Sequence, residues 1–290
     1  MCDDHSVEDQ ARYLATAALS RRQFAALTGA AGLALLLPVP ANAAEIAGRD
    51  VIIATPDGRA DAYFVAPRGG KHPGVLMWPD IMGLRPAFRQ MADRLAQSGY
   101  AVLVVNQFYR STKAPFLAPG QQYDDPAARA IIAPMLKALS DDGTVRDARA
   151  FTAFIDAQPE TDTRRGMATT GYCMGGPMML RTAAARADRI RAGGSFHGAS
   201  LVTAKPDSPH LLVPQLKGRY LFAIAESDDQ RSPTDKDVLR KAFADAHIPA
   251  EIEVYAGTAH GWCPLDTKVY NPAQAERAWG RMLALFQQAL

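Results

Sequence analysis

A cysteine stands at the centre of the hexapeptide Gly-Tyr-Cys-Met-Gly-Gly at residues 171–176. The pattern has the G-x-nucleophile-x-G form of a nucleophile elbow, with cysteine where serine is more usual. So sharp a strand-to-helix turn forces Cys173 into a disfavoured backbone region, and the glycines are needed because a Cβ would clash with the neighbouring strand and helix. The motif predicts an exposed thiol at a helix N-terminus, where the helix dipole favours thiolate. The alternative is a glycine-rich turn around a buried cysteine.

An acid and a histidine follow Cys173 in the chain, each just after an apolar, strand-like run. Asp228 and Asp229 follow the first run, and His260 follows the second. Nucleophile, acid and histidine in this order are typical of α/β-hydrolase triads. In that chemistry the histidine takes the thiol proton and later protonates the leaving group, while the carboxylate fixes the histidine tautomer. The alternatives are an ordinary loop histidine and a helix-capping acid, for which Asp229 is the nearer candidate.

The elements that must position these residues alternate between strands and helices. Apolar runs predict strands over residues 51–55, 60–66, 74–78, 101–105, 167–171, 192–196, 219–225 and 250–255. Helical patterns predict helices over residues 86–98, 126–139, 144–157, 174–187, 233–246 and 272–289. The alternation predicts an α/β fold with a doubly wound, mostly parallel sheet and helices on both faces, and an antiparallel hairpin around Asp57-Gly58. In such sheets the site lies at the carboxyl ends of the strands.

Three motifs together resemble the dienelactone hydrolase family of α/β-hydrolases. They are the hexapeptide, the segment Leu-Phe-Ala-Ile-Ala-Glu-Ser-Asp at 221–228 and the Ala-His-Gly at 259–261. The likeness runs from about residue 61 to the C-terminus. It implies Cys173 as nucleophile, Asp228 as the orienting acid and His260 as base, with Asp229 as second choice for the acid. No metal or cofactor is expected.

The resemblance also carries over residues near the nucleophile. Asp80 follows the strand 74–78 at a position where the family has a glutamate that contacts the resting thiol and helps to activate it. Asp80 is one methylene shorter. By the same analogy, the backbone N–H groups of Ile81 and Met174 form the oxyanion hole.

Four further residues are expected to line the substrate site. Arg110 matches a family arginine that binds the substrate carboxylate. Its neighbour Tyr109, with Phe108 and the stretch 111–125, forms either a lid or a plain surface loop. The family's second arginine is missing after the catalytic histidine, where Trp262 stands instead as pocket wall or core. This favours an ester, lactone or thioester other than dienelactone. His197 lies in the pocket or the core; its position ahead of the acid disfavours it as the catalytic base.

The first 43 residues resemble a twin-arginine export signal. Ser-Arg-Arg-Gln-Phe at 20–24 precedes an apolar stretch at 25–37 and a small-x-small site ending at Ala43. We expect cleavage after Ala43 and one hydrolase domain over 44–290, located in the periplasm or outside the cell, with the twin-arginine export machinery as a partner and no membrane insertion after cleavage. The alternatives are an uncleaved membrane anchor and a misassigned start.

Composition and the number of cysteines limit which classes of function the sequence allows. The chain has 290 residues, a formal net charge of +2 and no basic run, so nucleic acid is not expected as a partner. If Cys2 leaves with the signal, Cys173 and Cys263 remain and allow at most one disulfide. The sequence therefore predicts an enzyme that hydrolyses a small carboxylic ester or lactone through Cys, His and Asp. The alternatives are a non-catalytic ligand-binding member of the fold and a thiol redox protein using Cys173 with Cys263.

Overall fold

The computed structural model describes residues 4–16, 37–38, 40 and 43–290. Arg21, Arg22 and nearly all of the predicted apolar stretch lie outside the described residues. Within the predicted signal the structure describes a helix, α1 (Asp4–Thr16), which the sequence analysis did not predict. Among the described residues no helix has the length and apolar character needed to cross a membrane.

The centre of the fold is a sheet of eight strands in the order β1-β2-β4-β3-β5-β6-β7-β8. The strands are β1 (Ile46–Thr55), β2 (Gly58–Pro67), β3 (Gly74–Trp78), β4 (Ala101–Val105), β5 (Met167–Tyr172), β6 (Ile190–Phe196), β7 (Arg219–Ala225) and β8 (Ala250–Tyr255). The strands from β3 to β8 run parallel, whereas β1 and β2 form an antiparallel hairpin whose turn lies between Thr55 and Gly58. The predicted mostly parallel sheet with its hairpin is confirmed.

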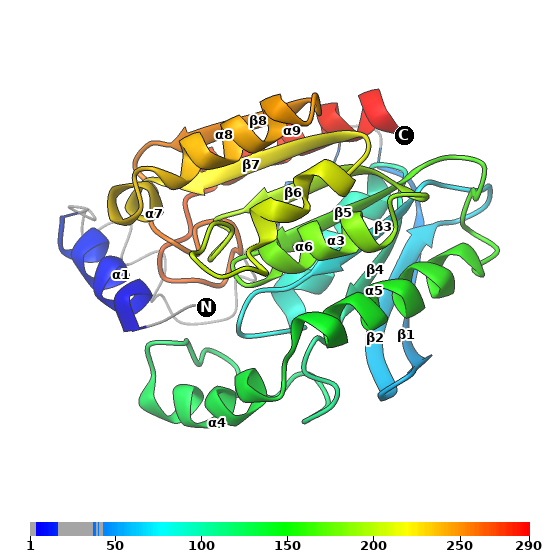
Figure 1. The fold of residues 1–290 in the computed structure, drawn as a ribbon. Coiled ribbons are helices and arrows are strands. Elements are labelled where there is room, and N and C mark those ends of the chain that lie inside the picture. The colour runs from blue at the N-terminus through cyan, green and yellow to red at the C-terminus, as the bar shows by residue number, and fades with distance from the viewer. Residues whose placement is uncertain (1–3, 17–36, 39, 41–42) are drawn as a thin grey trace.

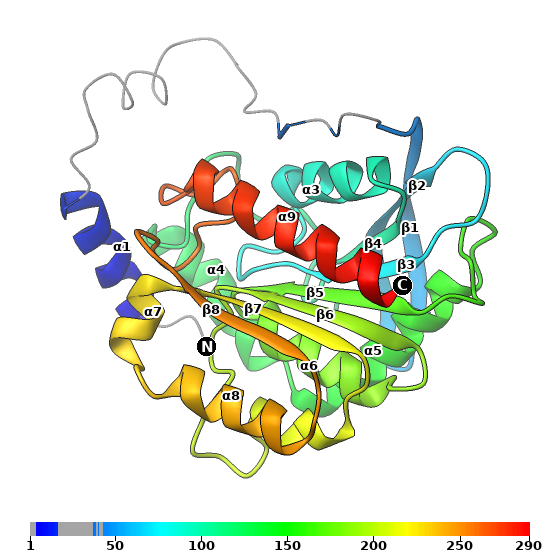
Figure 2. The ribbon, with the colours of Figure 1, turned by 90° about the horizontal axis from the view of Figure 1, so that it is seen from above.

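Helices cover both faces of this sheet, as Figures 1 and 2 show. One face carries α3 (Pro86–Gln97) and α9 (Pro272–Ala289), and the other carries α5 (Asp141–Asp156), α6 (Gly175–Ala185) and α8 (Asp235–Asp245). Helix α4 (Pro126–Lys137) precedes α5, and the sequence patterns had indicated all six of these helices. They had not indicated the short helix α7 (Glu226–Arg231) or the 3₁₀ helix η1 (Pro209–Gln215).

Two apolar cores hold the layers together, one on each face. Every residue of β3 and β4 is buried, which explains why the sequences of these strands are continuous apolar runs. Phe88 of α3 and Phe286 of α9 belong to one core; Phe151 of α5 belongs to the other. Removing each such ring from water contributes about 1.5–3 kcal/mol, so the two cores fix the strand ends that carry the site.

The sheet register places several loops at one edge. Tyr172 of β5 lies opposite Phe196 of β6, Phe196 lies opposite Ala223 of β7, and Ala225 lies opposite Tyr255 of β8. The residues that follow these strands therefore meet at the carboxyl edge of the sheet.

Candidate active site

The turn after β5 is a nucleophile elbow. Cys173 has φ of 53°, in the left-handed region that non-glycine residues rarely adopt. A Cβ on Gly171 would lie 1.9 Å from the carbonyl oxygen of Gly175, and a Cβ on Gly175 would lie 2.4 Å from the carbonyl oxygen of Trp78. Glycine at both positions is what lets β3, β5 and α6 approach so closely around Cys173.

Cys173 is buried, with 2% of its surface exposed, so the expectation of an exposed thiol is wrong. The loops at 79–85 and 258–265, which follow β3 and β8, are buried throughout. Cys173 is also disulfide-bonded, whereas Cys263 is a free, buried cysteine, so the two are not bonded to one another. Since a thiolate is the attacking species, Cys173 must be reduced before it can act as a nucleophile.

His260 is paired with Asp228. Its Nδ1 lies 2.8 Å from Oδ2 and 3.0 Å from Oδ1 of Asp228, and its main-chain amide donates to Oγ of Ser227 at 2.9 Å. Asp229 instead forms an ion pair with Lys236 at 2.6 Å. With Nδ1–H donating to the carboxylate, Nε2 is the basic nitrogen of His260.

His197 follows β6 and faces His260. Its side chain is fully buried, its ring centroid lies 5.2 Å from that of His260 and 6.3 Å from that of Trp262, and it too has positive φ, at 40°. Among the described residues neither of its ring nitrogens has a hydrogen-bond partner. Burial, helped by the neighbouring His260, lowers the pKa of His197 well below its ordinary value, so it is a neutral imidazole beside the candidate base.

Trp262 shares this environment. Its ring is fully buried and stacks on Tyr255 with centroids 5.0 Å apart, and its Nε1 has no partner among the described residues. Trp262 and His197 therefore bring unpaired polar atoms to the neighbourhood of His260, an arrangement typical of functional sites.

Asp80 is held in a buried ion-pair cluster. Its carboxylate accepts from Arg85 through two hydrogen bonds, at 2.6 and 3.0 Å, and from the amide of Met82 at 2.9 Å. Arg85 also donates to Asp266, at 2.7 and 2.9 Å. Burial opposes the charge of Arg85, but the two carboxylates outweigh it and raise its pKa. Activation of Cys173 by Asp80 stays a prediction, and it would require Asp80 to leave Arg85.

Ile81 and Met174 carry the two main-chain amides that the resemblance assigns to an oxyanion hole. Ile81 and Met174 are buried, and neither amide donates a hydrogen bond to another described residue. Met174 begins the turn into α6, and the contact between Gly175 and the Trp78 carbonyl brings that turn against the loop carrying Ile81. Unpaired buried amides at this point are suited to stabilising a developing oxyanion.

Arg110 and Tyr109 belong to a second ion-pair cluster. Arg110 makes two hydrogen bonds to Asp147, at 2.7 and 2.8 Å, and two to Asp57, at 2.6 and 3.2 Å. The Tyr109 hydroxyl donates to Asp147 at 2.7 Å and contacts Oγ1 of Thr55 at the same distance. Binding of a substrate carboxylate by Arg110 stays a prediction, and one of these pairs would have to open first.

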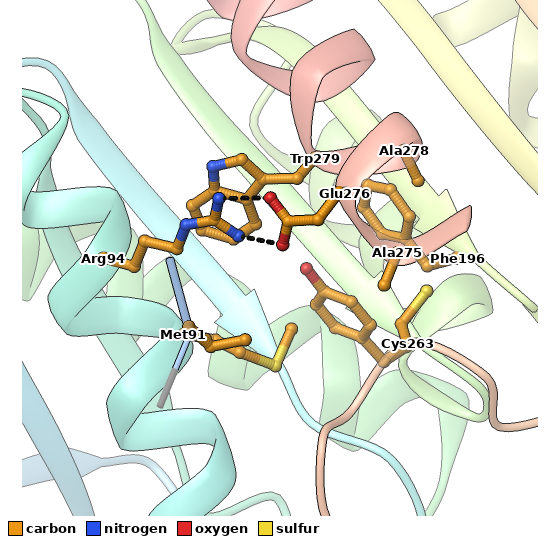
Figure 3. Close-up of a pocket in the computed structure, with 10 residues that line it drawn as sticks. Met91, Arg94, Phe196, Cys263, Ala275, Glu276, Ala278 and Trp279 are labelled. Atoms are coloured by element: carbon orange, nitrogen blue, oxygen red, sulfur yellow. Dashed lines mark hydrogen bonds and ion pairs between the residues drawn. The ribbon is translucent and has the colours of Figure 1, made fainter. Parts of the chain in front are cut away.

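A small cavity lies on the α3/α9 face of the sheet and is separate from the residues described above. Figure 3 shows it beside Arg94 and Glu276, which form two hydrogen bonds at 2.6 and 2.7 Å, with Cys263 and Trp279 also in its lining. Neither Cys173 nor His260 lines it. The cavity therefore gives no support to a role for Cys263 in the same chemistry as Cys173.

The partners of several site residues could not be predicted from the sequence. No motif marks Arg85, Asp147 or Asp266, and Asp57 was noted only as part of the hairpin turn. Ser227 was visible beside Asp228, but nothing in the sequence indicates that it accepts from the amide of His260.

The parallel sheet, the elbow after β5 and the acid–histidine pair after β7 and β8 define an α/β-hydrolase. Residues 60–290 match the Dienelactone hydrolase family, and the chain belongs to that family of hydrolases.

Similar proteins agree with this assignment. A protein of Methylorubrum extorquens named putative carboxymethylenebutenolidase is 26% identical over 281 residues, with 93% of each chain covered. The carboxymethylenebutenolidase of Rhodococcus opacus is 26% identical over 219 residues, which cover 74% of this chain and 81% of that one. The crystal structure of a putative dienelactone hydrolase from Klebsiella pneumoniae has a TM-score of 0.70 at 23% identity, covering 84% of this chain and 99% of that one, and shows the shared fold.

The elbow glycines give a prediction about stability. Gly171→Ala should destabilise the protein by about 1–3 kcal/mol or more, because its Cβ would overlap the backbone of Gly175. Gly280→Ala in α9 is the matched control: nothing lies near its Cβ, so it should stabilise by about 0.5–1 kcal/mol. Urea unfolding of both variants measures this. Equal stability of the two would mean that the elbow backbone is not tightly packed.

His197 gives a prediction about pH. Folding keeps His197 neutral by lowering its pKa, whereas in the unfolded chain His197 binds a proton near pH 6.5. The contribution of neutral His197 to the free energy of unfolding is therefore fully present above about pH 6.5. Below that pH the free energy of unfolding falls by about 1.4 kcal/mol per pH unit. His197→Asn, which tolerates positive φ, should flatten the fall in stability between about pH 5 and 8, measured by urea unfolding.

His247→Asn is the control for this experiment, because His247 is exposed and has φ of 54°. That variant should keep the pH dependence of the parent protein. If His197→Asn kept it too, His197 would not be held neutral by the fold.

Proposed function

We propose that this protein hydrolyses a carboxylic ester or lactone through a covalent intermediate on Cys173, with His260 as general base and Asp228 as the group that orients it. The observation that carries the proposal is the Asp228–His260 hydrogen bond at the same sheet edge as a cysteine with φ of 53°. Nucleophile, base and orienting acid on these strand ends follow the logic of hydrolytic triads.

Acylation begins with the reduced thiol. Nε2 of His260 accepts its proton, and the Cys173 sulfur attacks the substrate carbonyl carbon. The carbonyl oxygen becomes an oxyanion, which the amides of Ile81 and Met174 stabilise by hydrogen bonds. The carbon–oxygen bond of the ester then breaks, and the imidazolium of His260 gives its proton to the departing alkoxide.

Deacylation reverses these roles. His260 takes a proton from water, and the resulting hydroxide attacks the thioester carbon. The bond between this carbon and the Cys173 sulfur breaks, the acid departs as product, and His260 returns its proton to the Cys173 thiolate. Asp228 keeps the same hydrogen bond throughout and stabilises the imidazolium when it forms. In a lactone the alkoxide and the acid are parts of one molecule, so ring opening gives a single hydroxy acid; an enol lactone gives an enol that tautomerises to the keto acid.

The proposed substrate class rests on the names of the relatives and on the ion pairs of the two arginines near the candidate site. Relatives named carboxymethylenebutenolidase suggest an unsaturated lactone or a small ester. Arg110 and Arg85 are each already paired with two carboxylates. We therefore propose a neutral or weakly anionic substrate. Comparison of kcat/KM for one ester with and without a carboxylate tests this, and a strong preference for the anionic ester would refute it.

The triad assignment gives a prediction with an internal control. In the reduced protein, Asp228→Asn should lower kcat by about 10³- to 10⁴-fold, because the amide cannot hold His260 in the required tautomer. Asp229→Asn breaks only the pair with Lys236 and should change kcat by no more than a few-fold. Initial rates on a chromogenic short-chain ester measure both.

Two cysteine variants complete the test. Cys173→Ala should abolish turnover while the circular dichroism spectrum stays that of the folded protein. Cys263→Ala should retain turnover, because Cys263 lies beside the separate cavity. Retention of more than about a tenth of the rate in Cys173→Ala would contradict the covalent mechanism.

We also propose export by the twin-arginine route. Paired Arg21→Lys and Arg22→Lys substitutions should leave the precursor in the cytoplasm, as measured by cell fractionation, because this route reads the two arginines. An unchanged distribution of the protein would contradict the signal, and an intact N-terminus in the membrane fraction would indicate an anchor.

A further inference from the structure

The loop after β6 holds His197 beside both the candidate nucleophile and the candidate base. The main-chain amide of Cys173 donates to the carbonyl oxygen of Phe196 at 3.1 Å, and the amide of Ala199 donates to the carbonyl oxygen of Cys173 at 3.1 Å. His197 lies between these two bonded residues in the chain, and its ring meets that of His260 edge to face, with centroids 5.2 Å apart. His197 is therefore tied to Cys173 through its backbone and contacts His260 through its ring.

The packing of this loop fixes the position of His197. A Cβ on Gly198 would lie 2.2 Å from Oγ of Ser195, and a Cβ on Gly176 would lie 2.8 Å from Cα of Gly198. The first turn of α6 thus packs directly against the residue that follows His197. His197 itself has φ of 40°, a costly conformation for a residue with a side chain, and strain of this kind is concentrated at functional sites.

Buried polar atoms at His197 lack partners. Within the described part of the chain, neither ring nitrogen of His197 has a hydrogen-bond partner, and nor does Nε1 of Trp262, although both side chains are fully buried. The centroids of the two rings lie 6.3 Å apart. Polar atoms of this kind are costly to leave unpaired, and buried water is their usual partner where the protein supplies none. Three such atoms beside the candidate base therefore point to a small polar molecule as their partner.

Hydrolysis of the acyl-enzyme requires a water in a defined orientation. Nε2 of His260 takes the hydrogen that is transferred as a proton. An acceptor for the second hydrogen fixes the rotation of the water, so that a lone pair of its oxygen points at the thioester carbon on Cys173. A neutral imidazole has one acceptor nitrogen. Burial, and next the neighbouring His260, lower the pKa of His197 well below its ordinary value, so His197 keeps this acceptor at neutral pH.

We propose that His197 holds the water that hydrolyses the acyl-enzyme: a ring nitrogen of His197 accepts one hydrogen of this water while Nε2 of His260 accepts the other. The proton goes to His260, the water oxygen bonds to the acyl carbon, and the carbon–sulfur bond then breaks as the thiolate of Cys173 leaves. His197 gives and takes no proton in this step and supplies only a hydrogen bond. The inference rests on the proposed function, because it concerns the second half of that reaction.

An added alcohol distinguishes this role from a structural one. Methanol has a single hydroxyl hydrogen, which His260 accepts, and it has no second hydrogen to give to His197. Loss of the acceptor at His197 should therefore slow hydrolysis of the acyl-enzyme but not its methanolysis. A residue that only kept His260 or Cys173 in place would affect both reactions alike.

His197→Leu and His197→Asn form a matched pair, because leucine and asparagine have similar shapes but only asparagine has a side-chain acceptor. In the reduced protein, with a p-nitrophenyl ester as acyl donor and methanol added, His197→Leu should raise the ratio of methyl ester to acid in the products by about tenfold or more. His197→Asn should stay within a few-fold of the parent ratio. His247→Leu, at an exposed residue that also has positive φ, is the control and should leave the ratio unchanged.

Two further measurements support the comparison. Since only deacylation is slowed, His197→Leu should release a burst of nitrophenolate, and mass spectrometry after an acid quench should find the acyl group on Cys173. The longer pair His197→Met and His197→Gln repeats the test with a second matched set of side chains, and circular dichroism checks that each variant is folded.

The outcomes separate this inference from the proposed function. A raised ratio in the leucine and methionine variants but not in the asparagine and glutamine variants, with the acyl group on Cys173, supports both. An acyl group on Cys173 with equal loss of hydrolysis and methanolysis would overturn the role of His197 and leave the proposed function standing. In the parent, phenyl and p-nitrophenyl esters of one acid should give the same product ratio, because both pass through one acyl-enzyme. A ratio that depends on the leaving group, or no turnover by the reduced parent, would refute the proposed function and this inference with it.

Discussion

The site depends on one constraint, the closeness of three backbones at the carboxyl end of β5. Gly171 and Gly175 have no Cβ, and the carbonyls of Gly175 and Trp78 occupy the space where those atoms would be. This closeness forces Cys173 to positive φ and places the turn into α6 against the loop after β3. The strained backbone of Cys173 and the positions of the two candidate oxyanion donors therefore follow from the same contact.

A second constraint is electrostatic. Arg85 joins Asp80 of the loop after β3 to Asp266 of the loop after His260, so a single buried guanidinium ties these two loops together. Since removing one partner of a buried pair leaves an uncompensated charge, these loops are held firmly. Asp80 stands where the family has a glutamate, but its charge is matched by Arg85.

The sequence predicted β3 and β4 well because burial on both faces leaves only apolar residues in them, and β7 and β8 also have the predicted bounds. It did not predict α7, whose residues Glu-Ser-Asp-Asp-Gln-Arg contain no apolar side chain and so show no helical periodicity. The elbow and the acid–histidine pair could be predicted from local motifs. The partners of Arg110 could not, because a guanidinium suits a substrate carboxylate and Asp147, 37 positions away, equally well.

The burial of Cys173 was beyond local reasoning for a related reason, since the residues that share its core come from distant parts of the chain, among them Ile81 and Met82 of the loop after β3. That loop is in turn joined through Arg85 to the loop after β8. The backbone strain at Cys173 follows from its own neighbouring glycines, so a local motif predicts it. The exposure of its side chain depends on what other segments place against it, and no local motif records that.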